Sequence, residues 1–283
     1  MRAEVFDHRP CELGEGPLWH PERGQLFWFD ILGQRLLSRQ GGRVLDWALG
    51  ECASAAGWID RDTLLIATES GLYRFDIPSG GRERVVPLEA DTPATRSNDG
   101  RADPSGGFWI GTMGKRAEPG LGAIYRFHRG EVVKLHDRIG IPNSICFSPD
   151  GRTAYFADTA EGRIFRQPLD AEGWPAAAVA ELFVDLSGQA FGPDGSVTDA
   201  QGALWNAQWG AGRVARYLPD GTLDRVVAVG GAHSSCPAFG GETLSTLYIT
   251  TAREGIVAPG PGDGLVYRAA AGIRGRAEPR VRL

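Results

Sequence analysis

The sequence predicts an all-β fold, namely a six-bladed β-propeller with four-stranded blades. First, a short aromatic or apolar segment recurs six times in 283 residues, at steps of 38, 43, 46, 50 and 43 residues. The central residues of these segments are Trp28, Ile66, Trp109, Tyr155, Trp205 and Tyr248. Second, the chain contains 40 Gly and 18 Pro, which suits many short strands joined by tight turns. Third, long helical patterns are missing, because the best candidate, residues 171–184, is interrupted by Gly173 and Pro175.

The unit around Tyr155 shows the expected order of strands. Residues 143–147 form an apolar first strand, and the SPDG sequence at 148–151 is a turn in which Pro and Gly favour the required backbone angles. Residues 153–157 and 163–167 are then the second and third strands. One such meander cannot bury both of its faces, so six of them are expected to stack around an axis.

Closure of the ring requires a strand from the other end of the chain. We expect residues 3–7 to add the outermost strand to the last blade, whose remaining strands lie within residues 234–269. The alternative of two all-β domains would need a linker, and no linker-like stretch divides the chain. Residues 1–283 are therefore expected to form a single propeller domain.

Composition excludes several classes of partner and places the protein in the cytoplasm. The net charge is −5 and basic residues are scattered, which disfavours nucleic acid and anionic membranes as partners. No run of 18 apolar residues predicts a membrane span, and the start MRAEVFDHRP lacks the apolar core of a signal peptide. The four cysteines lie far apart without a CxxC pair, which predicts reduced, buried thiols. They are Cys11, Cys52, Cys146 and Cys236.

Six polar or acidic residues occupy the same place in the six units, 11 to 13 residues before each central residue. They are Glu15, Ser54, Asn98, Asn143, Asp194 and Ser235. In a propeller the innermost strands line a central tunnel, and their first residues lie together at one mouth. We therefore expect these side chains, which are remote in sequence, to face one another.

Three of these positions predict a metal site. Glu15, Asn143 and Asp194 offer two carboxylates and one amide oxygen, which suit a hard divalent cation. Without an ion, two convergent carboxylates would repel each other and one pKa would rise. Ca, Zn, Mg, Mn and Fe(II) all tolerate such ligands. With water in the remaining positions, such a site can polarise a carbonyl and activate water.

Each metal-site residue also has a simpler interpretation. The PDG sequence at 193–195 could be an ordinary β-turn, like the PDG sequences at 149–151 and 219–221. Glu15 could be a solvated surface acid, and Asn143 could cap the end of a strand. The register separates these cases, because Asp194 precedes its central residue by 11 positions and Asp150 by only five.

Asn98 and Arg96 are candidate substrate-binding residues. Asn98 could be a fourth ligand, a water-mediated ligand or a substrate contact. Arg96 lies two residues earlier on the same face of the strand, so its cation could hold a substrate hydroxyl or carboxylate. A surface ion pair is the alternative role for Arg96.

Other signals are weak. The GAGRVA sequence at 210–215 resembles a dinucleotide motif but opens a strand instead of a helix, and the chain contains no GxSxG and no HExxH. His233, Trp209 and Phe191 fall near the predicted mouth and could contribute to the pocket.

With these residues, the chain resembles the regucalcin–gluconolactonase family of six-bladed propellers along almost its entire length. The motifs are GEGPLW, RSNDGRADPSGGFWIGTM, NSICFSPDG, PDGSVTDAQGALWNAQWG and the TAR ending at Arg253. The resemblance implies lactonase activity with a bound divalent ion, with metal ligands at Glu15, Asn143 and Asp194 and substrate contacts at Arg96 and Asn98. The PDGSVTDAQGALWNAQWG segment is most similar to bacterial sugar lactonases.

The chain departs from the family at two places. Some animal members carry an acidic residue shortly after GTM, where this chain has GKRAEPG with Lys115 and Arg116. Their substrate preference therefore does not transfer. Ser144 stands where glycine is frequent in the family, and we expect this to change the tunnel wall only modestly.

The predicted function is hydrolysis of a sugar lactone, such as gluconolactone or a pentonolactone, to its aldonic acid. Asp194 is expected to be the catalytic base as well as a ligand of one divalent metal ion. The alternatives are a non-enzymatic calcium-binding regulatory propeller and a protein-interaction scaffold, which would expose an apolar patch. Hydrolysis of other esters, as in paraoxonase-like propellers, also remains open. The expected partner is a small sugar lactone, and the expected state is a monomer or small homo-oligomer.

Overall fold

The computed structural model describes residues 1–283, which form 24 β-strands and no helix. The first three antiparallel units contain β2 (Gly14–His20), β3 (Gln25–Asp30), β4 (Arg35–Gln40), β5 (Arg43–Ala48), β6 (Ala53–Asp60), β7 (Thr63–Thr68), β8 (Gly71–Asp76), β9 (Arg82–Pro87), β10 (Thr95–Ala102), β11 (Phe108–Gly114), β12 (Gly122–His128) and β13 (Glu131–Ile139). The remaining strands are β14 (Pro142–Phe147), β15 (Thr153–Asp158), β16 (Arg163–Pro168), β17 (Glu181–Asp185), β18 (Gly192–Thr198), β19 (Leu204–Trp209), β20 (Arg213–Tyr217), β21 (Leu223–Ala228), β22 (His233–Gly240), β23 (Thr246–Ala252), β24 (Val266–Ala270) and β1 (Glu4–Asp7).

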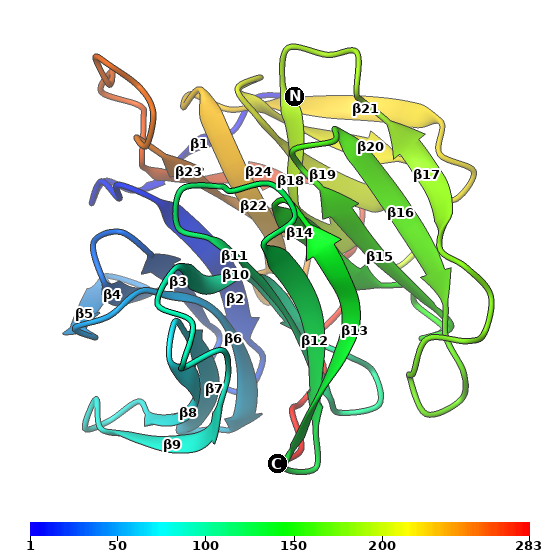
Figure 1. Cartoon of the computed structure of the whole chain (residues 1–283). Coiled ribbons are helices and arrows are strands. Elements are labelled where there is room, and N and C mark those ends of the chain that lie inside the picture. The colour runs from blue at the N-terminus through cyan, green and yellow to red at the C-terminus, as the bar shows by residue number, and fades with distance from the viewer.

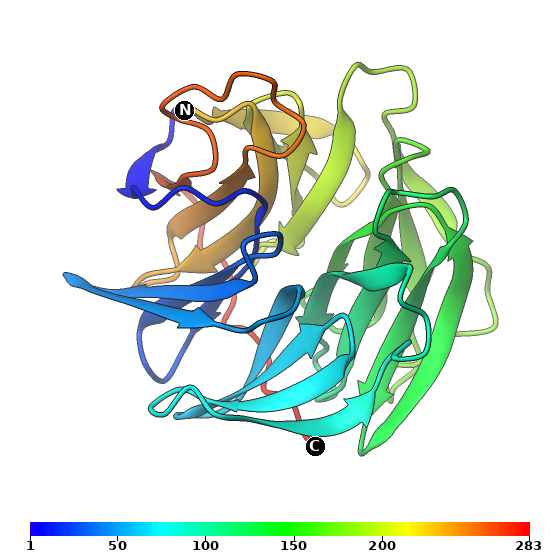
Figure 2. The ribbon, with the colours of Figure 1, turned by 60° about the vertical axis from the view of Figure 1, so that its left-hand side comes forward.

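The strands form an all-β, propeller-like fold whose groups surround a common centre (Figures 1 and 2). The prediction of six separate blades is corrected in one respect. Four sheets have four strands each, but β18–β21 and the group β22, β23, β24 and β1 form one eight-stranded sheet. The connection is a single pair, Trp209 with His233. The rings of these two residues stack with centroids 4.2 Å apart, where the end of β19 meets the start of β22.

The strands expected around Tyr155 are present as β14, β15 and β16. No helix forms at residues 171–184, where turns lead into β17. Gly173 adopts a positive φ of 82° there, and Pro175 lacks a backbone donor, so neither residue supports a helical turn.

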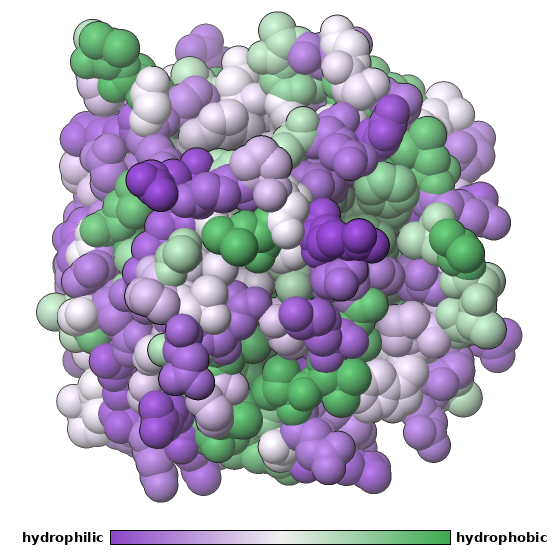
Figure 3. Space-filling model, viewed as in Figure 1, coloured by the Kyte–Doolittle hydropathy of each residue, from purple (hydrophilic) through white to green (hydrophobic).

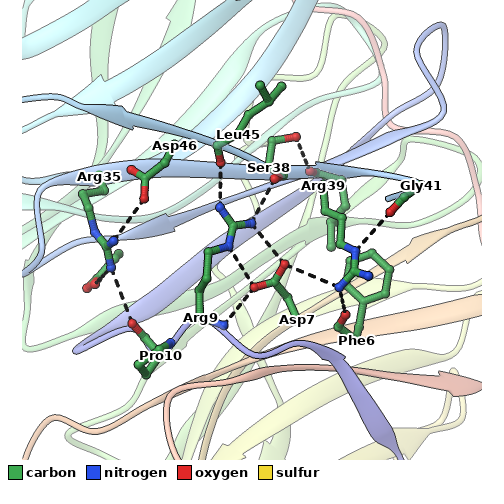
Figure 4. A network of polar contacts seen from close by, with 12 residues as sticks. Phe6, Asp7, Arg9, Pro10, Arg35, Ser38, Arg39, Gly41, Leu45 and Asp46 are labelled. Atoms are coloured by element: carbon green, nitrogen blue, oxygen red, sulfur yellow. Dashed lines mark hydrogen bonds and ion pairs between the residues drawn. The ribbon is translucent and has the colours of Figure 1, made fainter. Parts of the chain in front are cut away.

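The N-terminal strand closes the ring as expected, since β1 pairs antiparallel with β24. Asp7 is buried and accepts from the Arg9 guanidinium at 3.0 and 3.1 Å (Figure 4). Arg9 in turn donates to the carbonyls of Leu45 at 2.8 Å and Ser38 at 2.9 Å, which belong to the first unit. The same short segment therefore completes the last unit and fastens it to the first.

The first and second strands of each unit are almost entirely buried. Trp28, Ile66, Trp109 and Trp205, four of the six repeating central residues, have no exposed surface. Exposed large hydrophobic side chains are instead spread over outer strands and loops, and hydrophilic residues cover most of the face in Figure 3. These exposed residues include Val44, Leu121, Val133, Val179, Leu182, Leu223 and Val257. None of the segments is a helix with the length and apolar character needed to cross a membrane.

The C-terminal segment, residues 272–283, covers the end of the tunnel opposite the starts of the inner strands. It bonds to the turns that follow these strands, with Gly275 N donating to Leu244 O at 2.7 Å and Arg282 N donating to Gly106 O at 2.8 Å. Glu278 of this segment pairs with Arg101 of β10. The tunnel therefore has an open mouth at one end and a floor made by the C-terminal residues at the other.

Candidate active site

Each innermost strand has an irregularity in its pairing at the position that the repeat register singled out. The interrupted intervals are 15–18, 53–55, 97–100, 143–146, 193–196 and 234–237. A bulge redirects a side chain away from the regular alternation of a strand. These six local irregularities explain how the equivalent side chains can point toward the tunnel axis.

Five of the predicted residues line one cavity of about 380 Å³ at the mouth. They are Glu15, Arg96, Asn98, Asn143 and Asp194. The structure thus brings together four of the six register positions, from β2, β10, β14 and β18, with Arg96 beside them. The volume lies in the range of small-molecule sites, about 300–1,000 Å³.

The other two register positions have a different place. Ser54 Oγ donates to the Asn98 carbonyl, and Ser235 Oγ donates to the Gly14 carbonyl, both at 2.5 Å. Both serines are fully buried between neighbouring inner strands. They connect adjacent units instead of lining the cavity.

A chain of hydrogen bonds fixes the amide side chains of the cavity. Arg96 donates to Asn98 Oδ1 at 2.8 Å, and Asn98 Nδ2 donates to Asn143 Oδ1 at 3.1 Å. Asn143 Nδ2 then donates to Thr159 Oγ1 at 2.8 Å, and Thr159 donates to the Pro193 carbonyl at 2.6 Å. These contacts turn the side-chain oxygen of Asn143 away from Thr159 and toward Asn98.

Two carboxylates of the cavity, Glu15 and Asp194, are buried, and the charge near them does not offset the cost of that burial. Burial, reinforced by the charge of Asp99, raises the pKa of Glu15 above its usual range. Burial, reinforced by the charge of Glu15, likewise raises the pKa of Asp194. Arg96 is the cation among them, and burial lowers its pKa. Two carboxyl groups therefore share a low-dielectric site in which both cannot ionise freely.

This donor set fits a divalent cation. No group of three His, Cys, Asp or Glu side chains is arranged to hold a metal ion, so a site here would need the Asn143 amide oxygen beside Glu15 and Asp194. Oxygen ligands of this kind suit hard cations. An added charge of +2 would remove the penalty that burial and mutual repulsion place on the two carboxylates.

The cavity also contains residues that the repeat register did not single out. Met113, Thr159, Trp209 and Glu254 all line it. The first three each lie four residues after the central residue of their unit, at the end of a second strand. Applying the register to the ends of the second strands, as well as to the starts of the first, would have identified them.

Lys115 and Arg116, in the loop between β11 and β12, lie at the cavity wall. Lys115 forms an ion pair with Glu69, and Arg116 pairs with Glu118 at 3.0 Å while remaining largely exposed. Their place beside the cavity makes them candidates for contact with a substrate.

Two further residues near the mouth, His233 and Phe191, lie outside the lining of the cavity. His233 does not line the cavity, but its ring stacks on Trp209 and its Nδ1 contacts the Glu254 carbonyl at 2.9 Å. Phe191 lies under the Arg213 guanidinium and is also outside the lining. Of the three residues considered for the pocket, only Trp209 reaches it.

The chain is similar to known proteins over most of its length. Residues 13–253 match the SMP-30/gluconolactonase/LRE-like family. An L-arabinolactonase of Azospirillum brasilense is 38% identical, covering 95% of this chain and 91% of the relative. A 6-deoxy-6-sulfogluconolactonase of Pseudomonas putida is 34% identical, covering 96% and 95% of the two chains.

Among solved structures, a calcium-binding protein, regucalcin, from Agrobacterium tumefaciens superimposes with a TM-score of 0.96. It is 45% identical, and the match covers 99% of this chain and 97% of that chain. The similarity therefore extends over the whole propeller and includes every strand that contributes to the cavity.

Proposed function

Since the chain belongs to the SMP-30/gluconolactonase/LRE-like family, we propose that it is a metal-dependent lactonase that converts a sugar lactone to the aldonic acid. One observation carries this proposal: carboxylate, amide and guanidinium groups from four separate strands line a single cavity of substrate size. In this proposal residues 1–283 act as one six-bladed domain in the cytoplasm, and the eight-stranded sheet counts as two blades.

Glu15, Asn143 and Asp194 would hold one divalent cation. When bound, such an ion neutralises the two carboxylates and polarises the lactone carbonyl. The rest of the reaction is assigned to side chains of the protein itself.

Asp194 is the general base of this proposal. Its carboxylate takes a proton from the attacking water, whose oxygen bonds to the carbonyl carbon. The ring C–O bond then breaks, and the proton is returned to the leaving ring oxygen, which becomes a hydroxyl group.

Arg96 and Asn98 bind and orient the substrate. The buried Arg96 guanidinium donates to Ser97 O at 2.9 Å and to Asn98 Oδ1 at 2.8 Å, so both side chains are held before substrate enters. Fixed donors and acceptors reduce the entropy lost when the hydroxyls of a lactone are aligned. Lys115 and Arg116 extend the cationic side of the cavity.

The test is acid release from glucono-lactone and from a panel of pentonolactones, compared with the spontaneous reaction and repeated with a chelator. We expect release above the spontaneous rate that chelator abolishes and one of the five divalent metals restores. Chelator-resistant hydrolysis would contradict metal dependence.

The second candidate is a non-enzymatic calcium-binding propeller, favoured by the description of the Agrobacterium relative as a calcium-binding protein. It predicts that calcium binds while acid release from every lactone stays at the spontaneous rate. Exchange of Glu15 for Gln separates the two candidates further, because only a lactonase would lose turnover together with ion binding.

A further inference from the structure

Ser144 adopts a backbone conformation that serine rarely occupies. Its φ is +59°, in the left-handed region, and it is fully buried. A non-glycine residue in this region costs free energy, and such residues persist where surrounding contacts compensate for it. The residue immediately follows Asn143, one of the proposed metal ligands, so its contacts affect the site directly.

The hydroxyl of Ser144 uses its full hydrogen-bonding capacity. It donates to the Asp194 carbonyl at 2.6 Å and accepts from Ser196 Oγ at 3.0 Å and from Asn206 Nδ2 at 3.2 Å. A hydroxyl has one donor and two acceptor sites, and all three are occupied here. Asn206 also donates to the Asp194 carbonyl at 3.0 Å. Both bonds to Asp194 engage its main chain and leave its carboxylate for the cavity.

The equivalent junction between the first two units shows why this contact is specific. Gly16 follows Glu15 as Ser144 follows Asn143, and its φ of +53° is nearly the same. A Cβ at Gly16 would lie only 2.1 Å from the Ser54 carbonyl, which is the register equivalent of the Asp194 carbonyl. That junction is too close for any side chain. The junction at Ser144 is wide enough for a hydroxymethyl group, which spans it.

We infer that Ser144 is a positioning residue that sets the separation of the Asn143 and Asp194 donor groups, an inference that rests on the proposed metal site. Asn143 is adjacent to Ser144 in the chain, and Asp194 is held through its carbonyl, so one side chain links the two ligand-bearing strands β14 and β18.

Thr198 provides a matched control. It lies on β18 and donates through Oγ1 to the Phe147 carbonyl of β14 at 2.6 Å, and it is 4% exposed. The bond joins the same two strands through the same kind of group, but it lies further along them than the Ser144 contact, by three residues on β14 and four on β18. Thr198→Val removes that bond without touching the cavity.

The experiment measures the affinity of the purified, metal-free protein for the divalent ion that the wild type binds best, by titration calorimetry with the ion alone. We expect Ser144→Ala and Ser144→Gly both to weaken binding about tenfold, the effect of losing one net hydrogen bond that holds a ligand in place. Ser144→Gly should melt at a higher temperature than Ser144→Ala, because glycine accepts the positive φ without strain. Thr198→Val should lower the melting temperature but leave ion affinity unchanged.

Ion affinity of Ser144→Gly equal to that of the wild type would overturn the inference. The same holds if Thr198→Val weakens ion binding as much as Ser144→Ala does, since the effect would then belong to general pairing of β14 with β18. A wild-type protein without affinity for any divalent ion would contradict the proposed function itself, and the inference with it.

Discussion

The two ends of the central tunnel contain buried charges that are balanced in different ways. At the floor, the guanidinium of Arg101 pairs with Glu278 and donates to the carbonyls of Ile145 at 3.2 Å and Ser196 at 3.1 Å. At the mouth, Glu15 and Asp194 share a cavity with Arg96. The floor therefore contains an ion pair within the chain, whereas no ion pair joins Arg96 to Glu15 or Asp194 at the mouth.

Asp99 lies between the two ends of the tunnel, and its pKa is raised less than those of the acids at the mouth. Its Oδ2 accepts from the Ile145 backbone at 2.7 Å, and the nearby Arg101 favours its charged form. Burial still raises its pKa to about 6, less far than at the mouth. In one tunnel, therefore, a buried carboxyl with a permanent cation beside it stays closer to its usual pKa. At the mouth, Arg96 does not offset the burial and mutual repulsion of Glu15 and Asp194, which marks the place where a cation from solution is needed.

The largest expected effect is on stability, at the floor. Glu278→Gln leaves the Arg101 charge buried without its partner, and such a change costs about 3 kcal/mol or more. Chemical denaturation measures the loss in the free energy of unfolding. Glu4→Gln is the control, because Glu4 pairs with Arg268 while 70% exposed and should cost at most about 1 kcal/mol. Equal effects of the two changes would show that the floor pair is not a distinct buried element.

The next effect concerns catalysis at the mouth. Asp194→Asn removes the proposed base and one ligand charge, so lactone turnover should fall by about 10²-fold or more. Asp220→Asn is a matched control, since Asp220 occupies the same Pro-Asp-Gly sequence in a surface turn and should leave turnover unchanged. Near-complete turnover of Asp194→Asn with metal bound would remove Asp194 from the role of base.

A smaller effect tests the charge state of the mouth directly. Because burial raises the pKa values of Glu15 and Asp194, the pair without a cation holds a proton at neutral pH. Metal binding requires both carboxylates to be ionised, so binding should release about one proton near pH 7 and become weaker as the pH falls. Calorimetry in buffers of different ionisation enthalpy measures this release, which should decrease as the pH rises. Release that is absent near pH 7 would mean that the acids are already ionised.

The smallest effect is expected at the rim. Lys115 is 40% exposed and pairs with Glu69, so Lys115→Gln should change the KM for the lactone about two- to fivefold and leave kcat almost unchanged. Steady-state kinetics on several lactones would show which substrates are affected. A large fall in kcat would place Lys115 at the reacting atoms instead of the rim.

The sequence allowed the positions of the site to be predicted because a propeller repeats the same geometry in each unit. Equal spacing before the central residues placed Glu15, Asn98, Asn143 and Asp194 together without any local motif. The strands of the unit around Tyr155 and closure by β1 were predicted for the same reason, since turn residues and alternating patterns are local signals.

Other features depend on contacts between units and could not be read from the spacing. The eight-stranded sheet arises from one pair, Trp209 with His233, whose rings meet across two units. The closure of the floor depends on Glu278, which follows the last repeat and has no register equivalent. The left-handed conformation of Ser144 depends on the distance between β14 and β18, which the spacing of the repeats does not predict.

The most direct test of the central claim, that the mouth is completed by a cation, is an anomalous-diffraction map from crystals soaked in Mn²⁺. We predict one strong peak within coordination distance of the side-chain oxygens of Glu15, Asn143 and Asp194. A map with no peak at the mouth, or with manganese bound only elsewhere, would contradict the account.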